Sequence, residues 1–148
     1  MARESLSALL KLRLQAVDEA RTKLVDCLRR EGEAAMAADR ARKAIEAEMN
    51  RASSLSAEDG DVDAFVAWLP RGRAQLDQAN AALDRAQGAA IQARTELSMA
   101  RGAAEAVEEV IHQRAERGLA EERRREQAEF DDMAGRSARN RVVSLPSG

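Results

Sequence analysis

The stretch 50-NRASSLSAEDGDVD-63 decides the fold, because it interrupts two long heptad patterns. It is rich in Asn, Ser, Asp and Gly, whose short side chains cap backbone amides or whose backbones tolerate tight turns. Gly60 can take a positive φ in such a turn. The chain is therefore expected to end one helix here and to start another.

A heptad pattern of nearly six repeats precedes this turn. Alternating steps of four and three residues, starting at Leu10, select thirteen positions, of which ten are apolar. Polar residues at such a seam commonly set the register of a coiled coil at a cost in stability, and here they are Arg21, Glu31 and Arg42. The whole predicted seam is Leu10, Leu14, Val17, Arg21, Leu24, Leu28, Glu31, Ala35, Ala38, Arg42, Ile45, Met49 and Ala52.

A second heptad pattern follows the turn and extends from Phe65 to Ile111. Thirteen of its fourteen positions are apolar, and Gly72 is the exception. Two long seams joined by one turn can cover each other only by folding back, so the sequence predicts an all-α, antiparallel two-helix coiled-coil hairpin. Six of the fourteen positions of the second seam are alanine. Since a buried methylene contributes roughly 0.8 kcal/mol, alanine layers stabilise less than leucine layers, and we expect a hairpin of low stability.

The register predicts a C-terminal helical overhang. With the turn centred near residue 58, Ser5 lies opposite residue 111, and the second seam also ends at Ile111. Residues 112–138 are then expected to extend beyond the hairpin as a helix about 40 Å long, at 1.5 Å per residue. Spacings of four residues join Glu121 to Arg125 and Arg125 to Glu129, which supports a solvated helix.

These boundaries predict one coiled-coil domain over residues 1–140, followed by a disordered tail at 141–148. Its helices are expected at about 5–55 and 63–138, and its turn at about 56–62. Lys and Arg (24) nearly balance Asp and Glu (26), so a nucleic acid is not the expected partner. The apolar runs are too short for a membrane span or a signal peptide. We therefore expect a soluble, cytoplasmic protein.

The residue types that carry catalysis or bind metals do not form a site in this sequence. Cys27 and His112 are the only cysteine and histidine, and the hairpin register separates them, so we expect a small apolar residue beside the seam and a solvated histidine. The run 59-DGDVD-63 has the spacing of a calcium loop but lacks its glycine and its closing glutamate, and it is expected to cap a helix. We expect no enzyme activity, no metal and no cofactor.

Two groups of residues are candidates for binding partner proteins. Phe65, Trp68 and Leu69 lie beside the turn, where they either close the end of the hairpin or contact a partner, and Pro70 starts or kinks the helix there. In the overhang, Arg123 and Arg124 belong to a basic run that glutamates flank, as on a solvated helix face. Apolar residues of the overhang follow helical spacing and have no partner within the chain; they are Phe130, Met133, Ala134 and Ala138.

The chain resembles the FliJ family of flagellar type III export and its relatives of the YscO group in injectisomes. The resemblance covers nearly the whole chain. It lies in the N-terminal run LLKLRLQAVDEARTKL, the tip FVAWL and, most specifically, the C-terminal run AERGLAEERRREQAEFDDMAGRSARN.

The resemblance implies a coiled-coil stalk without chemistry of its own, similar to the central shaft of rotary ATPases. Such a stalk would bind a hexameric export ATPase with the end that carries both termini, reach the export gate protein through its side or tip, and bind export chaperones. It would lie at the cytoplasmic face of the inner membrane through its partners alone. The alternatives are an injectisome stalk, an unrelated coiled-coil scaffold, and a helical protein that binds nucleic acid through its C-terminal arginines.

Overall fold

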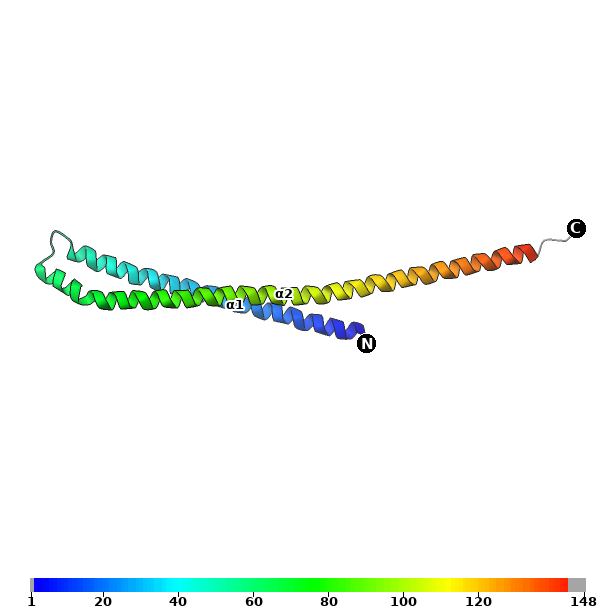
Figure 1. The fold of residues 1–148 in the computed structure, drawn as a ribbon, viewed down its shortest axis with the longest axis horizontal. Helices are drawn as coiled ribbons and strands as arrows, with labels where there is room; N and C mark the ends of the chain where they lie inside the picture. Colours follow the sequence, from blue (N-terminus) through cyan, green and yellow to red (C-terminus); the bar gives the residue numbers. More distant parts are fainter. Residues whose placement is uncertain (1, 144–148) are drawn as a thin grey trace. The chain divides into compact units, whose positions relative to one another are not determined.

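The structure is a computed structural model in which residues 2–143 are described (Figure 1). It contains two α-helices, α1 (Ala2–Ala52) and α2 (Asp59–Val143), and the described residues contain no strand. The two helices pack against each other, which confirms the predicted all-α hairpin. α1 starts and ends three residues before its expected bounds, and α2 starts four residues early.

The C-terminal end of α2 differs from the expectation. Residues 141–143, which were expected in a disordered tail, continue the helix. Nothing in this run opposes a helix, because the first helix-breaking residue after it is Pro146. The rest of the predicted tail, residues 144–148, lies outside the described residues.

Contacts divide the chain into two units: residues 12–103 form one, and residues 1–11 with 104–148 form the other. In the larger unit, the seam predicted on α2 is confirmed. Each of its positions from Phe65 to Ala100 is buried or half-buried, and Ala90 and Ala93 are only 1% exposed. The most deeply buried residues on the α2 side of the hairpin core are thus the small residues Ala90 and Ala93.

The seam predicted on α1 is half wrong. Every seventh residue from Leu10 to Ala52 is buried or half-buried, as expected. The alternate positions lie one residue earlier than predicted, and the residues that occupy them are Ala20, Cys27, Ala34, Ala41 and Glu48. The residues predicted there are exposed instead, and they are Leu14, Arg21, Leu28, Ala35, Arg42 and Met49.

Charge explains this shift. The seam as predicted would bury Arg21 and Arg42 among apolar residues, and burying a charged group is costly. In the structure, Arg21 lies 3.7 Å from Asp18, and Arg42 hydrogen-bonds to Asp39, all on the surface of α1. Exposing three large apolar residues costs less than burying two guanidinium groups.

Cys27 is consequently a seam residue rather than a neighbour of the seam. It is buried and forms a core cluster with Ala90 and Ala93, against which Leu24 packs. One turn earlier, Lys23 Nζ donates a hydrogen bond of 2.8 Å to Glu96 Oε2, and this ion pair joins the two helices. The carboxylate raises the pKa of Lys23 above its ordinary value. In both contacts, the midpoint of the two residues along the sequence lies within two residues of the expected centre of the turn, residue 58.

The turn itself contains one expected feature and lacks another. Asp61 caps α2, since its Oδ2 accepts a hydrogen bond of 2.9 Å from the backbone N–H of Glu58, while the Glu58 carbonyl accepts one from the Asp61 N–H. Gly60 does not use its freedom to take a positive φ: it lies in the first turn of α2, and no described glycine has a positive φ.

The first turns of α2 contain Pro70, and Figure 1 shows them inclined to the rest of the helix. A proline inside a helix removes one backbone hydrogen bond and commonly kinks it. Two residues before the proline, the Trp68 indole lies over Gly72: a Cβ built on Gly72 would be 2.6 Å from Trp68 Cη2. Glycine at this seam position therefore leaves room for the only tryptophan.

In the smaller unit, the start of α1 packs on α2. A cavity of about 270 Å³ between them is lined by Arg3, Leu6, Ser7, Ile111, Arg114 and Ala115. This contact agrees with the register that placed Ser5 opposite residue 111. Ile111 is half-buried, and it is the last residue of the predicted seam.

Candidate partner-binding site

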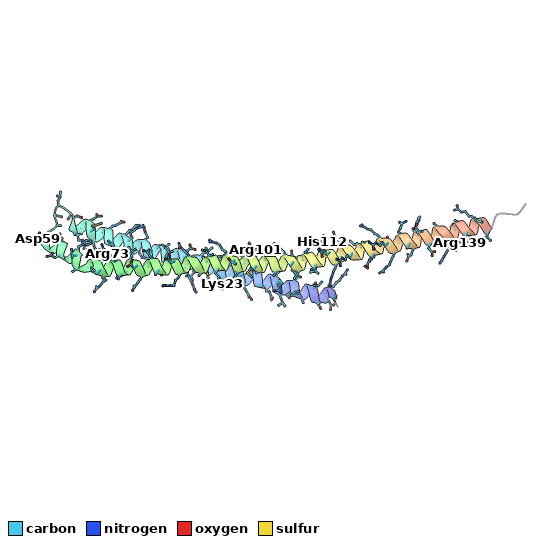
Figure 2. The ribbon with its side chains drawn as sticks, in the orientation of Figure 1. Lys23, Asp59, Arg73, Arg101, His112 and Arg139 are labelled. Carbon is cyan, nitrogen blue, oxygen red and sulfur yellow. The ribbon has the colours of Figure 1, made fainter. Side chains whose placement is uncertain are left out.

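The overhang begins where the seam ends. From His112 to Val143 every residue of α2 is exposed, except that Gly118 and Gly135 are half-exposed. Figure 2 shows the side chains of this part of α2 standing out from the helix, as at Arg139. A helix without a covering partner must rely on its own contacts, and here these are exposed pairs of side chains one turn apart.

Those local contacts differ from the predicted ones. His112 Nε2 lies 3.1 Å from Glu116 Oε1, Gln127 donates a hydrogen bond of 3.1 Å to Asp131, and Arg136 lies 3.2 Å from Asp132. The pairs expected between Glu121, Arg125 and Glu129 are not formed. The expectation of a solvated histidine at residue 112 is confirmed, since its side chain is 66% exposed.

Two of the predicted partner-binding residues form an apolar strip on the overhang. Phe130 is 68% exposed and Met133 is 69% exposed, and the two lie three residues apart on one helix face. Arg123, seven residues before Phe130, lies on the same face, whereas Arg124 lies a third of a turn away. Within residues 2–143, neither arginine has an ion-pair partner. The guanidinium groups are therefore available to carboxylates of another molecule.

The structure adds residues that the sequence reasoning missed. Leu119 is 54% exposed and precedes Phe130 by eleven residues, about three helical turns, so it extends the strip toward the hairpin. A shallow depression next to Met133 is lined by Arg136, Ser137, Asn140 and Arg141. The spacing of 119, 130 and 133 was readable in the sequence. Residues 140–141 were missed because the helix was expected to end before them.

The second predicted group lies at the start of α2, in the larger unit. Phe65, Trp68 and Leu69 are all half-buried. Part of the Trp68 surface covers Gly72 of the same helix, so this residue contributes to local packing. Each of the three side chains keeps part of its surface exposed to solvent.

Two side chains with reactive groups are engaged in packing and capping. Cys27 is packed among alanines, and Asp61 is engaged as a helix cap. Among residues 2–143, no three His, Cys, Asp or Glu side chains lie close enough together to hold a metal ion. Neither helix, over the same residues, has an apolar stretch long and uncharged enough to cross a bilayer.

Comparisons with known proteins identify the family. Searches of curated proteins and of solved structures give no match. A family model described as "Flagellar FliJ protein" matches residues 1–142, which is nearly the whole chain and includes α1 and all of α2 except Val143. The match agrees with the helical hairpin, and the chain belongs to the FliJ family of flagellar, export-related coiled-coil proteins.

Proposed function

We propose that the chain is a non-enzymatic stalk of the flagellar type III export apparatus and that its overhang binds the hexameric export ATPase. The observation that supports this most is the exposed strip of Phe130 and Met133 on a helix with no covering partner. Large apolar side chains on an otherwise charged helix are typical anchors of helix-in-groove interfaces. The arginines beside the strip would pair with acidic groups of the ATPase.

The other partners are proposed from the same family membership. The tip residues Phe65, Trp68 and Leu69 would contact the export gate protein, because half-buried aromatic residues supply large contact area at little entropic cost. Export chaperones would bind along the hairpin. The protein would act in the cytoplasm, and its partners would hold it at the inner membrane.

The test is binding to the purified export ATPase and stimulation of its ATP hydrolysis. Phe130→Ala should weaken binding by more than about 1 kcal/mol, as expected for a buried aromatic anchor. Arg124→Ala should mainly change the association rate and its dependence on salt. Leu12→Ala is the matched control, because Leu12 is similarly exposed, at 62%, but lies outside the overhang.

Circular dichroism serves as the folding control, and none of the three substitutions should change the helical signal. If Phe130→Ala unfolds the isolated protein, Phe130 belongs to a core. If it folds normally and binds the ATPase as tightly as the wild type, the overhang is not the binding element.

A further inference from the structure

The outer tip face is defined here as Asp59, Val62, Asp63 and Val66, at the start of α2. Steps of three and four residues place these side chains on one side of the helix. All four are exposed, Val62 at 45% and Val66 at 61%. The half-buried seam residue Phe65 lies on another side of the same turns. The outer tip face is therefore a surface of its own, with two apolar side chains between two carboxylates.

The outer tip face lies in the acidic end of the hairpin. From residue 52 to residue 70 the chain has four carboxylates and no lysine or arginine. Before this run, Arg51 already pairs with Glu48 at 3.4 Å. After it, the next arginine on the same face is Arg73 (Figure 2), about 15 Å beyond Asp63 along the helix. Since exposed charges more than about 8 Å apart are largely screened at physiological ionic strength, Arg73 does not neutralise this face.

The start of α2 accounts for only part of this charge. Asp59 and Asp61 lie in the first turn, where the helix dipole favours carboxylates, and Asp61 is the cap. Asp63 lies beyond that turn, and among residues 2–143 no side chain pairs with it or with Asp59. Pro70 adds an acceptor, because it has no N–H to donate to the carbonyl of Val66. The face thus offers hydrogen-bond acceptors that a donor-rich partner would satisfy.

We propose that the outer tip face docks a basic amphipathic segment of a partner protein. Apolar side chains of that segment cover Val62 and Val66, and its lysines or arginines pair with Asp59 and Asp63. The inference deepens the proposed contact between the tip and the export gate protein, and it rests on that proposal for the identity of the partner. What it adds is the chemistry of the partner surface, which is basic.

Charge favours a different protein over the other occupants. An anionic membrane surface would be repelled by the carboxylates of the tip. A second copy docked tip to tip would place these carboxylates against their own equivalents. The end of a second copy's overhang has three arginines and no carboxylate over residues 133–143. Of these, however, Arg136 already pairs with Asp132 of its own helix, and Arg141 also has an interaction partner.

The experiment measures binding of two labelled synthetic peptides to the full chain by fluorescence anisotropy. Both peptides are three-heptad amphipathic helices with the same leucine stripe; one carries lysines beside the stripe, and the other carries glutamates. The lysine peptide should bind, and the glutamate peptide should bind at least about tenfold more weakly. Added salt should weaken binding of the lysine peptide, because exposed ion pairs contribute to it.

Amide substitutions locate the charge contribution. Asp59→Asn with Asp63→Asn removes both charges of the outer tip face and keeps the shape of the side chains, so binding of the lysine peptide should weaken about tenfold or more. The matched control is Glu105→Gln with Glu108→Gln, which removes two exposed carboxylates of α2 away from the tip. This control should leave the affinity unchanged.

A second pair of variants tests the apolar contribution. Val66→Thr replaces a methyl group by a hydroxyl and should weaken binding about threefold or more. Ile91→Thr is the control, because Ile91 is similarly exposed, at 62%, but lies away from the tip. Trp68 lies on the opposite side of α2 from the outer tip face, so its emission, together with circular dichroism, should show every variant folded.

Equal affinity for both peptides, no binding of either, or equal effects of the variants and their controls would overturn the proposal. An oligomer in sedimentation equilibrium that Asp59→Asn with Asp63→Asn abolishes would overturn it in favour of a second copy. Binding of the purified gate protein separates the proposal from the function above. If the gate protein binds this double variant like the wild type but does not bind Phe65→Ala, the gate contact stands and the basic partner surface is wrong. If it binds no form of the chain while the peptide preference persists, the gate contact is wrong and the basic partner surface stands.

Discussion

At the scale of single residues, the hairpin depends on the fit of a few side chains rather than on a large core. Trp68 fits over Gly72 because glycine has no Cβ, and Lys23 reaches Glu96 because the two helices lie in one register. Asp61 satisfies a backbone N–H that the start of α2 would otherwise leave unpaired. Each of these contacts is accessible to a single substitution.

Gly72→Ala should displace the Trp68 indole without unfolding the protein. The added Cβ would lie 2.6 Å from Trp68 Cη2, far below an ordinary contact between carbon atoms, and the ring can move away. The chain has one tryptophan and no tyrosine, so intrinsic fluorescence reports this site alone. We expect a red-shifted emission with unchanged circular dichroism. Gly88→Ala, where a Cβ meets nothing within 4 Å, is the control and should leave the emission unchanged.

Lys23→Gln should reduce stability in a manner that depends on pH. The pKa of Lys23 is raised by the hydrogen bond to Glu96, so folding favours the protonated amine. The contribution is fully present below the ordinary lysine pKa of 10.5, and it is lost as the pH rises through the raised pKa of the folded protein. Thermal melts should therefore separate the two proteins at neutral pH. Because the pair is exposed, the separation should be small, and it should vanish above the raised pKa.

At the scale of the helices, α2 followed its sequence pattern, whereas α1 did not. The α2 seam has apolar residues at almost every position and no competing stripe. On α1, two seams one residue apart are compatible with the spacing, and both contain Leu10, Val17 and Leu24. They differ at the alternate positions, where the predicted seam has the larger side chains but also Arg21 and Arg42. Counting apolar residues does not distinguish the two seams, since each has four among its six alternate positions. The larger leucine and methionine side chains favoured the seam that is wrong, because the cost of burying charge depends on what lies opposite.

Two leucine substitutions distinguish the α1 seam seen in the structure from the one predicted from the sequence. Leu24→Ala removes a half-buried side chain that packs on the Cys27 cluster, and we expect a loss of about 1–3 kcal/mol, less than at a fully buried site. Leu28→Ala removes an exposed side chain and should cost below about 1 kcal/mol. Urea unfolding followed by circular dichroism measures both losses. Equal losses of unfolding free energy for the two variants would instead support the seam predicted from the sequence.

At the scale of the whole molecule, the division into two units determines which properties, such as hairpin stability and partner binding, substitutions can change independently. Residues 12–103 contain the turn and the cores of both helices, and residues 104–143 contain the last positions of the seam and the exposed strip. Substitutions on the overhang should therefore alter partner binding without altering hairpin stability. The single coiled-coil domain over residues 1–140 stays a prediction.

Distances between spin labels test the fold-back directly. With Cys27 replaced by Ala, labels at positions 25 and 92, or at 40 and 78, sit on exposed residues of facing helices in the larger unit. Helices in contact have axes about 8–10 Å apart, so each pair should give a distance below about 30 Å, including the label arms. Helices that do not fold back would place labels at 25 and 92 up to about 100 Å apart, at 1.5 Å per residue.

The sequence by itself determined the two helices, the turn near residue 58, the α2 seam and the place where pairing ends. These features follow from heptad spacing and turn residues, which act locally along the chain. It also indicated the exposed strip of Phe130 and Met133, because helical spacing and the lack of a partner were both readable.

Only the tertiary structure decided which phase of α1 faces α2, and hence that Cys27 is a core residue while Leu14 and Leu28 are exposed. It also decided that Trp68 covers Gly72. The physical reason is that burial is a property of two facing surfaces. The spacing on α1 offered two nearly equal apolar stripes, and the choice between them depended on the alanine-rich face opposite and on keeping Arg21 and Arg42 hydrated.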